Sequence, residues 1–408
     1  MLTEVEIQRR RFEASRVFTP AVPIDGQALF AGRTQQVTQV IDAINQAGQH
    51  AVIFGERGVG KTSLANVLAP WLESLGARVI APRVICDGQD TFSTIWRKVF
   101  TSIRLPTQTN RPGFVAFGPS ELAALDKVPE DFTPDDVRRL LESFGSAIVL
   151  IIIVDEFDRV PGSESRQLFA DTIKALSDYA VKATVVLVGV ADTVTELIAE
   201  HHSIARAVVQ VPMRRMSAKE LSQIIEKGLE RLEMTVEAEA LRHISLLSQG
   251  LPHYTHLLGL HASRAALTPG ETQVRMSHVK DAIREALEGA QQTIRSAYND
   301  AISSPRKDNL YADVLLACAL AEKDDLGLFP AANIRPPLNK ITGKAYDIPN
   351  FSQHLTNFCD GTRGPILERR GTKHRFRFRF IDPLMQPYVI MRGLQANKIN
   401  VRALEGKP

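Results

Sequence analysis

The sequence that decides the fold class of this 408-residue chain is Gly55-Glu56-Arg57-Gly58-Val59-Gly60-Lys61-Thr62, with Ser63 directly after it. It matches the pattern G-x-x-x-x-G-K-[ST], in which glycines let backbone N–H groups turn toward phosphate oxygens. Residues 51–54 before it predict a strand, and the apolar positions after it repeat with helical spacing. The sequence therefore predicts a phosphate-binding loop at the positive end of a helix dipole.

The parts of this loop have separate expected roles. Lys61 should reach the β- and γ-phosphates, and the Thr62 hydroxyl should ligate Mg²⁺. The predicted cofactors are therefore ATP and Mg²⁺, with residues 55–63 around the phosphates. A GTPase is disfavoured because the chain lacks an Asn-Lys-x-Asp motif. A chance match is the alternative, although chance does not explain the strand before the loop and the helix after it.

An acidic pair follows a second apolar strand, Ile148–Val154. A continuous apolar strand is typical of a parallel sheet covered on both faces, and such sheets bind ligands at their carboxyl edge. Asp155 should hold the Mg²⁺ directly or through water, and Glu156 should orient and deprotonate the attacking water. A solvated acidic pair at a strand end is the alternative interpretation.

Strands and helices alternate up to residue 212, which predicts an α/β core with a doubly wound parallel sheet of the P-loop NTPase kind. Beyond Met213 the strands stop, and Ser217–Glu220 forms a capping box that opens a helical domain. Residues 104–132 hold four prolines and are predicted to be a surface insertion. The predicted divisions are an N-terminal arm (1–30), the core (31–212), an all-helical lid (213–290), a linker (291–304), a winged-helix-like α+β domain (305–396) and a tail (397–408).

The bulk composition is that of an ordinary globular protein, with a formal net charge of +3 and a mean hydropathy of -0.08. No apolar run approaches the length of a membrane span, and no leader peptide is evident. The three cysteines are far apart, which suits a reducing compartment. We therefore expect a cytoplasmic protein with no membrane partner.

Taken together, these motifs resemble the AAA+ superfamily, most of all its origin-initiator branch and the related STAND-type and transposition-regulator ATPases. Gly55–Thr62 and Asp155-Glu156 correspond to the Walker A and Walker B motifs, and Phe30–Arg33 resembles the segment beside adenine. The resemblance covers residues from about 18 to 290, and residues 305–395 more weakly. It implies ATP binding between core and lid, and nucleotide-dependent self-association.

The resemblance also implies roles for three further residues. Asp192 occupies the sensor 1 position, where it would act on the γ-phosphate through water or a lysine, or simply cap a helix. Arg206 ends a segment similar to the arginine-finger segment, and would stabilise charge in a neighbouring subunit or form a surface salt bridge. His253 stands where initiators carry the sensor 2 arginine. A neutral histidine is a poorer clamp, which favours slow turnover, and a capping or packed histidine is the alternative.

Near the C-terminus, Arg375–Phe380 alternates arginine and phenylalanine. On a strand this pattern places three phenylalanines on one face and three arginines on the other. We expect the phenylalanines to pack in the domain and the arginines to face solvent or a partner, as the wing of a DNA-binding domain. A solvated charged edge is the alternative. The candidate nucleic-acid contacts are Arg369, Arg370, Lys373, Arg375, Arg377 and Arg379.

Three functions remain open from the sequence. The first is an ATP-controlled switch or assembly ATPase that binds DNA through its C-terminal domain. The second is a STAND-like signalling ATPase whose C-terminal domain docks a protein partner, and the third is an ATP-binding scaffold with little hydrolysis. No effector motif is visible, so downstream chemistry is expected in a separately encoded protein.

Overall fold

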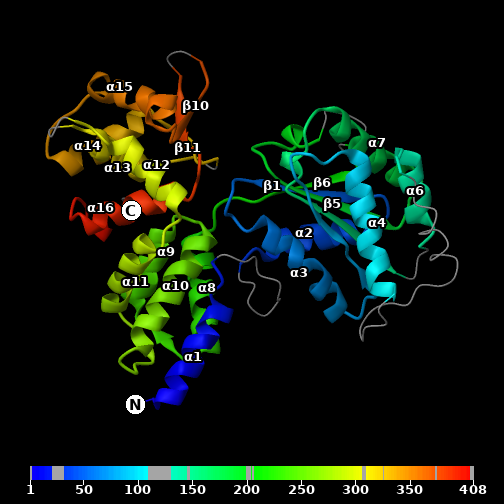
Figure 1. Ribbon diagram of the computed structural model, residues 1–408, viewed down its shortest axis with the longest axis horizontal. Coiled ribbons are helices and arrows are strands. Elements are labelled where there is room, and N and C mark those ends of the chain that lie inside the picture. Colours follow the sequence, from blue (N-terminus) through cyan, green and yellow to red (C-terminus); the bar gives the residue numbers. More distant parts are fainter. Residues whose placement is uncertain are drawn as a thin grey trace. The chain divides into compact units, whose positions relative to one another are not determined.

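The computed structural model divides into two compact units (Figure 1). The α/β unit comprises Pro23–Glu56 and Gly60–Met213, and the C-terminal unit comprises Met1–Val22, Arg57–Val59 and Arg214–Pro408. The structure describes residues 2–20, 32–108, 130–144, 148–198, 204, 206–305, 309–324, 326–372 and 375–404. Within these residues no helix combines the length and apolar character needed to cross a bilayer.

A six-stranded parallel sheet forms the centre of the α/β unit. Its strands are β1 (His50–Gly55), β2 (Val79–Ile80), β3 (Arg83–Ile85), β4 (Val149–Asp155), β5 (Ala183–Val190) and β6 (Val208–Pro212). Their order is β2-β4-β5-β1-β6, and β3 also pairs with β4. The predicted doubly wound parallel sheet is confirmed. β2 and β3 are separate short strands, because Pro82 between them has no backbone N–H to donate.

Helices cover both faces of this sheet, with α2 and α3 on one side and α4, α6 and α7 on the other (Figure 1). Adjacent residues of a strand, such as Ile151 and Ile152 of β4, point to opposite faces of the sheet. Both are buried, as expected for a parallel sheet covered on both faces. The elements are α2 (Thr34–Asn45), α3 (Lys61–Ser74), α4 (Phe92–Gln108), α6 (Pro134–Glu142), α7 (Glu164–Asp178) and the 3-10 helices η1 (Phe157–Arg159) and η2 (Val194–Glu196).

An aromatic cluster anchors the α4 and α7 side of the core. The Trp96 and Phe169 rings stack at a centroid distance of 5.7 Å, and Phe157 meets Phe169 edge-on at 4.9 Å. Because Phe157 directly follows Asp155 and Glu156, this packing fixes the acidic segment to the core. Most of the predicted insertion at 104–132 lies outside the described residues.

His50 is a buried neutral histidine at the start of β1. Its Nδ1 accepts a hydrogen bond from the Val185 backbone N–H at 3.0 Å. Burial lowers the pKa of its imidazole from 6.5 to about 4. His256 in the C-terminal unit shows the same lowering of its pKa, to about 4, for the same reason. Both side chains make folding sensitive to acid, because the unfolded chain protonates them first.

We expect the α/β unit to lose about 3 kcal/mol of stability as the pH falls from about 6.5 to about 4. In this window the unfolded state binds the proton on His50 and the folded state does not. Urea unfolding followed across this range measures the loss. His50→Leu should be less stable at neutral pH, since it leaves the Val185 N–H unpaired, but its stability should depend less on pH. An equally steep dependence in that variant would assign the acid sensitivity to other groups.

The lid in the C-terminal unit is helical, and its connecting segments form a two-stranded sheet of β7 and β8. Residues predicted as an N-terminal arm instead include α1, which packs against α8 and α10 (Figure 1). The buried Phe18 ring fits against Gly228 and Gly259, where an added Cβ would lie only 2.4 Å and 2.8 Å from it. The elements are α1 (Glu4–Val17), α8 (Ala218–Arg231), β7 (Thr235–Val236), α9 (Ala238–Ser248), α10 (Pro252–Leu267), β8 (Gln273–Val274) and α11 (Met276–Glu288).

The last domain has the element order and antiparallel sheet of a winged helix, as predicted. Its three-stranded sheet has the order β10-β11-β9. The segment predicted as a linker contains α12, whose Ile294, Tyr298 and Ala301 are buried. The elements are α12 (Gln292–Ile302), α13 (Tyr311–Leu320), β9 (Phe329–Pro330), η3 (Ala331–Ile334), α14 (Arg335–Thr342), α15 (Ile348–Cys359), η4 (Gly361–Arg363), β10 (Leu367–Arg370), β11 (Arg377–Phe380), α16 (Met385–Gln395) and η5 (Val401–Leu404).

Buried hydrogen bonds join the lid to the winged-helix-like domain. Gln386 of α16 is 1% exposed, and its amide donates to Gln249 Oε1 of the lid at 2.8 Å and to the Ala319 carbonyl at 2.9 Å. The Tyr254 hydroxyl of α10 donates to the Leu384 carbonyl at 2.8 Å. Since an unmatched buried polar group is costly, these bonds hold the two domains in one arrangement.

Candidate functional site

The glycine-rich loop connects β1 to α3, as the sequence predicts. Gly58 and Gly60 have φ values of +85° and +93°, in the left-handed region that glycine adopts without strain. Gly55 has a different restriction, since a Cβ there would lie 2.3 Å from the Met213 carbonyl oxygen. Helix α3 begins at Lys61, so its first backbone N–H groups and the positive end of its dipole face the loop.

Lys61 folds back into this loop. Its Nζ donates to the Gly55 carbonyl at 3.0 Å and to the Glu56 carbonyl at 2.7 Å. The amine therefore lies against the loop backbone at the start of α3. A phosphate group cradled by the loop would be within reach of this charge, which is the arrangement that the sequence motif predicts.

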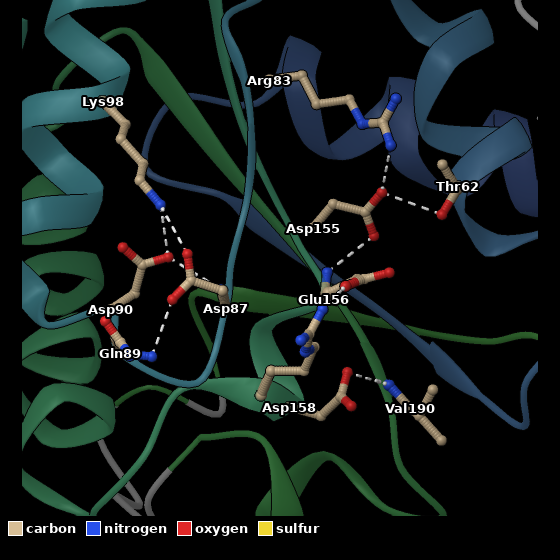
Figure 2. Close-up of polar contacts among 11 residues, drawn as sticks. Thr62, Arg83, Asp87, Gln89, Asp90, Lys98, Asp155, Glu156, Asp158 and Val190 are labelled. Atoms are coloured by element: carbon tan, nitrogen blue, oxygen red, sulfur yellow. Dashed lines mark hydrogen bonds and ion pairs between the residues drawn. The ribbon is translucent and has the colours of Figure 1, made fainter.

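Thr62 and Asp155 meet at the carboxyl edge of the sheet, although they are far apart in the sequence (Figure 2). The Thr62 hydroxyl donates to Asp155 Oδ2 at 3.0 Å, and the Glu156 backbone N–H donates to Asp155 Oδ1 at 2.9 Å. The Asp155 side chain is only 4% exposed. A hydroxyl and a carboxylate at this distance form a donor set of the hard oxygen type that Mg²⁺ prefers.

Glu156 points away from the core in a strained conformation. Its φ is +54°, which is unusual for a residue with a Cβ, and its Oε2 accepts a hydrogen bond from Arg159 at 2.7 Å. Phe157 anchors the chain on one side, and Asp158 accepts from the Val190 N–H at 2.7 Å on the other. The strain is thus held in place by the surrounding packing, as is common at functional sites.

Sequence reasoning missed two polar residues beside Asp155. Arg83 of β3 donates to Asp155 Oδ2 at 2.8 Å and to Asn66 Oδ1 of α3 at 3.0 Å. Figure 2 shows its guanidinium next to the Thr62–Asp155 pair. No motif marks either residue, because their proximity arises only when β3 pairs with β4. The one available signal is that Arg83 lies within the mostly apolar segment of residues 79–86.

A second charged group missed by sequence reasoning lies where the chain leaves β3. Lys98 of α4 pairs with Asp90 at 2.7 Å and with Asp87 at 3.4 Å (Figure 2). Burial raises the pKa of Asp90, but hydrogen bonds from Lys98 and the Asp87 backbone outweigh it and hold the pKa below its usual value. This group fixes α4 against the carboxyl edge of the sheet.

The sensor 1 candidate, Asp192, follows β5, which lies between β1 and β4 in the sheet. Its backbone N–H donates to Glu196 Oε2 at 3.0 Å. The arginine-finger candidate, Arg206, is exposed in a turn before β6, and its carbonyl accepts from Gln49 at 2.8 Å. Residues 202–203 and 205 of that segment lie outside the described residues, as do Phe30 and Ala31 of the predicted adenine segment.

His253 lies in the first turn of α10 in the C-terminal unit. Its Nδ1 is 2.8 Å from the Pro20 carbonyl oxygen, which can only accept, so Nδ1 carries the proton and donates. Burial lowers the pKa of His253. A neutral imidazole whose N–H is already used brings no positive charge to a phosphate.

The basic hairpin consists of β10 and β11. Phe378 and Phe380 are buried as predicted, but Phe376 precedes β11 and is only partly buried. The prediction that its arginines face solvent or a partner is only partly correct. Arg375 is exposed before the strand begins, but Arg377 pairs with Asp324 and Arg379 with Glu368. Arg370 also pairs with Glu368 at 3.2 Å, and the Arg369 guanidinium carbon lies 4.4 Å from the centroid of the Phe376 ring. Lys373 lies outside the described residues.

A family model described as Novel STAND NTPase 1 matches residues 23–300, more than half of the chain and both site motifs. The chain belongs to the novel STAND NTPase 1 family. The predicted resemblance to P-loop NTPases of the STAND type is thereby confirmed. No curated protein sequence matches this STAND NTPase.

This STAND NTPase is also similar to solved structures. A Walker-type ATPase of Pyrococcus abyssi has a TM-score of 0.55 at 16% identity, covering 91% of this chain and 99% of that chain. The ORC1 protein of Aeropyrum pernix, solved in complex with DNA, has a TM-score of 0.48 at 18% identity, covering 96% of this chain and 98% of that chain. The CDC6p protein of Pyrobaculum aerophilum has a TM-score of 0.46 at 14% identity, covering 95% of this chain and 99% of that chain. At such identities the first likeness establishes the fold alone.

Proposed function

We propose that this protein binds ATP with Mg²⁺ in the Gly55–Thr62 loop and hydrolyses it slowly, as a nucleotide-controlled switch. The observation that carries the proposal is the 3.0 Å hydrogen bond between Thr62 and Asp155, directly beside the glycine-rich loop. It puts the oxygen ligands expected for Mg²⁺ at the point where the loop presents its backbone donors.

Each residue has a role in this proposal. Lys61 and the backbone N–H groups of the loop bind the phosphate oxygens, and Thr62 and Asp155 hold the Mg²⁺. The metal, when bound, neutralises charge on the phosphates. Glu156 accepts the proton of the attacking water once its carboxylate leaves Arg159. Asp192, which follows the strand between β1 and β4, acts on the γ-phosphate through water or a lysine. Arg206 stabilises charge on the phosphates of a neighbouring subunit. His253 occupies the sensor 2 position of the lid.

Slow turnover is supported mainly by the lid. The ion pair between Glu156 and Arg159 is about half exposed and costs little to break, so it slows the base only slightly. His253 is neutral and already bonded to Pro20, so the lid lacks the positive charge of an arginine at this position. Calorimetric titration of the full chain with ATP and Mg²⁺ tests the binding, and phosphate release tests the turnover. Absence of any ATP binding would end this proposal.

We propose further that the winged-helix-like domain contacts DNA through its hairpin. The hairpin carries Arg369, Arg370, Arg375, Arg377 and Arg379 on four-residue strands and the turn between them. The side chains of Arg370 and Arg377 are 41% and 50% exposed. Exposed ion pairs of this kind contribute little stability, so a DNA phosphate can replace Asp324 or Glu368 at low cost.

Changing Arg375, Arg377 and Arg379 together to glutamine should weaken DNA binding without unfolding the domain, because buried Phe378 and Phe380 carry the packing. The slope of log affinity against log salt should become shallower by up to about 0.9 for each DNA phosphate that the hairpin no longer binds. Fluorescence anisotropy over a salt series, with and without ATP, measures both quantities.

The matched control replaces three exposed lid arginines, Arg231, Arg242 and Arg284, which removes the same net charge elsewhere. This control should retain the parent's salt slope. If the parent shows no salt-sensitive DNA binding with or without ATP, the DNA proposal fails. The leading function is then a signalling ATPase whose hairpin docks a protein partner, such as a separately encoded effector.

That alternative has a specific observation in its favour. Arg377 and Arg379 already pair with Asp324 and Glu368 of the same domain, so these two charges of the hairpin are balanced without DNA. Nucleotide-dependent self-association belongs to either function, and sedimentation with and without ATP detects it.

A further inference from the structure

We propose that Arg83 competes with Mg²⁺ for Asp155 and thereby sets a metal threshold for nucleotide binding. The proposal rests on the proposed ATP and Mg²⁺ site. Arg83 and Thr62 both donate to the same oxygen, Asp155 Oδ2, at 2.8 Å and 3.0 Å. A cation held by Thr62 and Asp155 would face the Arg83 guanidinium at close range, and like charges repel.

Asp155 needs a positive charge beside it. Its side chain is 4% exposed, and a buried carboxylate without a compensating partner is strongly unfavourable. Arg83 supplies that charge from within the α/β unit, while the Thr62 hydroxyl and the Glu156 N–H supply only neutral donors. The guanidinium therefore stabilises the same carboxylate that a metal would stabilise.

The fold holds Arg83 in place but leaves it able to withdraw. In the β3–β4 register Arg83 lies opposite Ile153, which is two residues before Asp155 on β4. Asn66 Oδ1 accepts a hydrogen bond from the second terminal nitrogen of the Arg83 guanidinium. The side chain is 29% exposed, and its buried Nε has no hydrogen-bond partner among the described residues. Moving the guanidinium toward solvent thus costs few bonds, and Mg²⁺ can displace it once the metal concentration is high enough.

Arg83→Gln tests this competition. The glutamine can still donate to Asp155 but carries no charge, so half-maximal binding of a fluorescent ATP analogue should occur at a Mg²⁺ concentration lower by about tenfold or more. The titration reads binding rather than hydrolysis. In the absence of Mg²⁺ and nucleotide the variant should also unfold at lower temperature than the parent, because Asp155 loses its ion pair with Arg83.

Two further variants keep the test interpretable. Arg138→Gln removes an arginine of the same unit that pairs with Asp135 and Glu142, and should leave the Mg²⁺ midpoint unchanged. Arg83→Lys keeps the charge but cannot bridge Asp155 and Asn66 as the planar guanidinium does. The Mg²⁺ midpoint of Arg83→Lys should fall between those of the parent and Arg83→Gln. If Arg83→Gln does not fold, Arg83→Lys still tests the competition.

The outcomes separate this inference from the proposed function. If the parent binds the ATP analogue and both Arg83 variants keep its Mg²⁺ midpoint or raise it, Arg83 does not compete with the metal and the inference is wrong. If the parent binds no nucleotide at any Mg²⁺ concentration, the proposed function itself fails, and the competition at Asp155 falls with it.

Discussion

Lys61→Ala should lower the affinity for ATP by about 100-fold or more, since the β- and γ-phosphates lose their nearest cation. The Lys61 amine is held by the Gly55 and Glu56 carbonyls at the start of α3, where the loop is expected to present its N–H groups to phosphate. The variant should remain folded, because the change removes polar contacts at the loop, the bonds to the Gly55 and Glu56 carbonyls among them, and no part of the apolar core. Calorimetric titration with ATP and Mg²⁺ measures the change in affinity.

Lys174→Ala is the matched control for this change. Lys174 is a half-exposed lysine of α7 that pairs with Asp178 at 3.2 Å on the same helix. Its removal lowers the net charge of the unit equally, and ATP affinity should be unaffected. ATP affinity at the parent level in a folded Lys61→Ala protein would mean that the glycine-rich loop is not the nucleotide site.

The parts of the site that the sequence predicts are those encoded in short segments. The loop Gly55–Thr62 specifies its own geometry through left-handed glycines, and the apolar strand before Asp155 specifies where the carboxylate emerges. Parallel pairing then brings Thr62 and Asp155 together, because the carboxyl ends of the strands share one edge. The doubly wound fold follows from the same alternation of strands and helices.

Other contacts could not be predicted because they join distant segments. Arg83 reaches Asp155 only through the β3–β4 register, and Phe18 reaches Gly228 only through packing of α1 on the lid. The hairpin shows the same limit: alternation correctly predicts the buried Phe378, but Asp324, which pairs with Arg377, lies on a separate loop. Helix α12 is an exception, because its buried residues recur at the spacing of an amphipathic helix, and only the polar composition of the segment favours a linker.

Glu156→Gln should hold ATP while turning it over about 100-fold more slowly than the parent, or slower still. Glutamine is nearly isosteric with glutamate, but its amide cannot accept the proton of the attacking water. ATP affinity should persist, because Glu156 lies outside the loop and contributes only its backbone N–H to Asp155, a bond that glutamine keeps. Single-turnover phosphate release with saturating ATP measures the rate, and calorimetry measures the affinity.

Arg159→Gln separates the proton-accepting role from the ion pair. Both substitutions break the ion pair between Arg159 and Glu156, but Arg159→Gln keeps the carboxylate and frees it. If Glu156 is the base, Arg159→Gln should hydrolyse ATP at the parent's rate or faster, because the base no longer has to leave its partner. If instead both variants are slowed equally, the ion pair matters for positioning the strained segment after β4. A Glu156→Gln protein with the parent's rate would remove Glu156 from the chemistry altogether, since no other change in that variant could replace the missing proton acceptor.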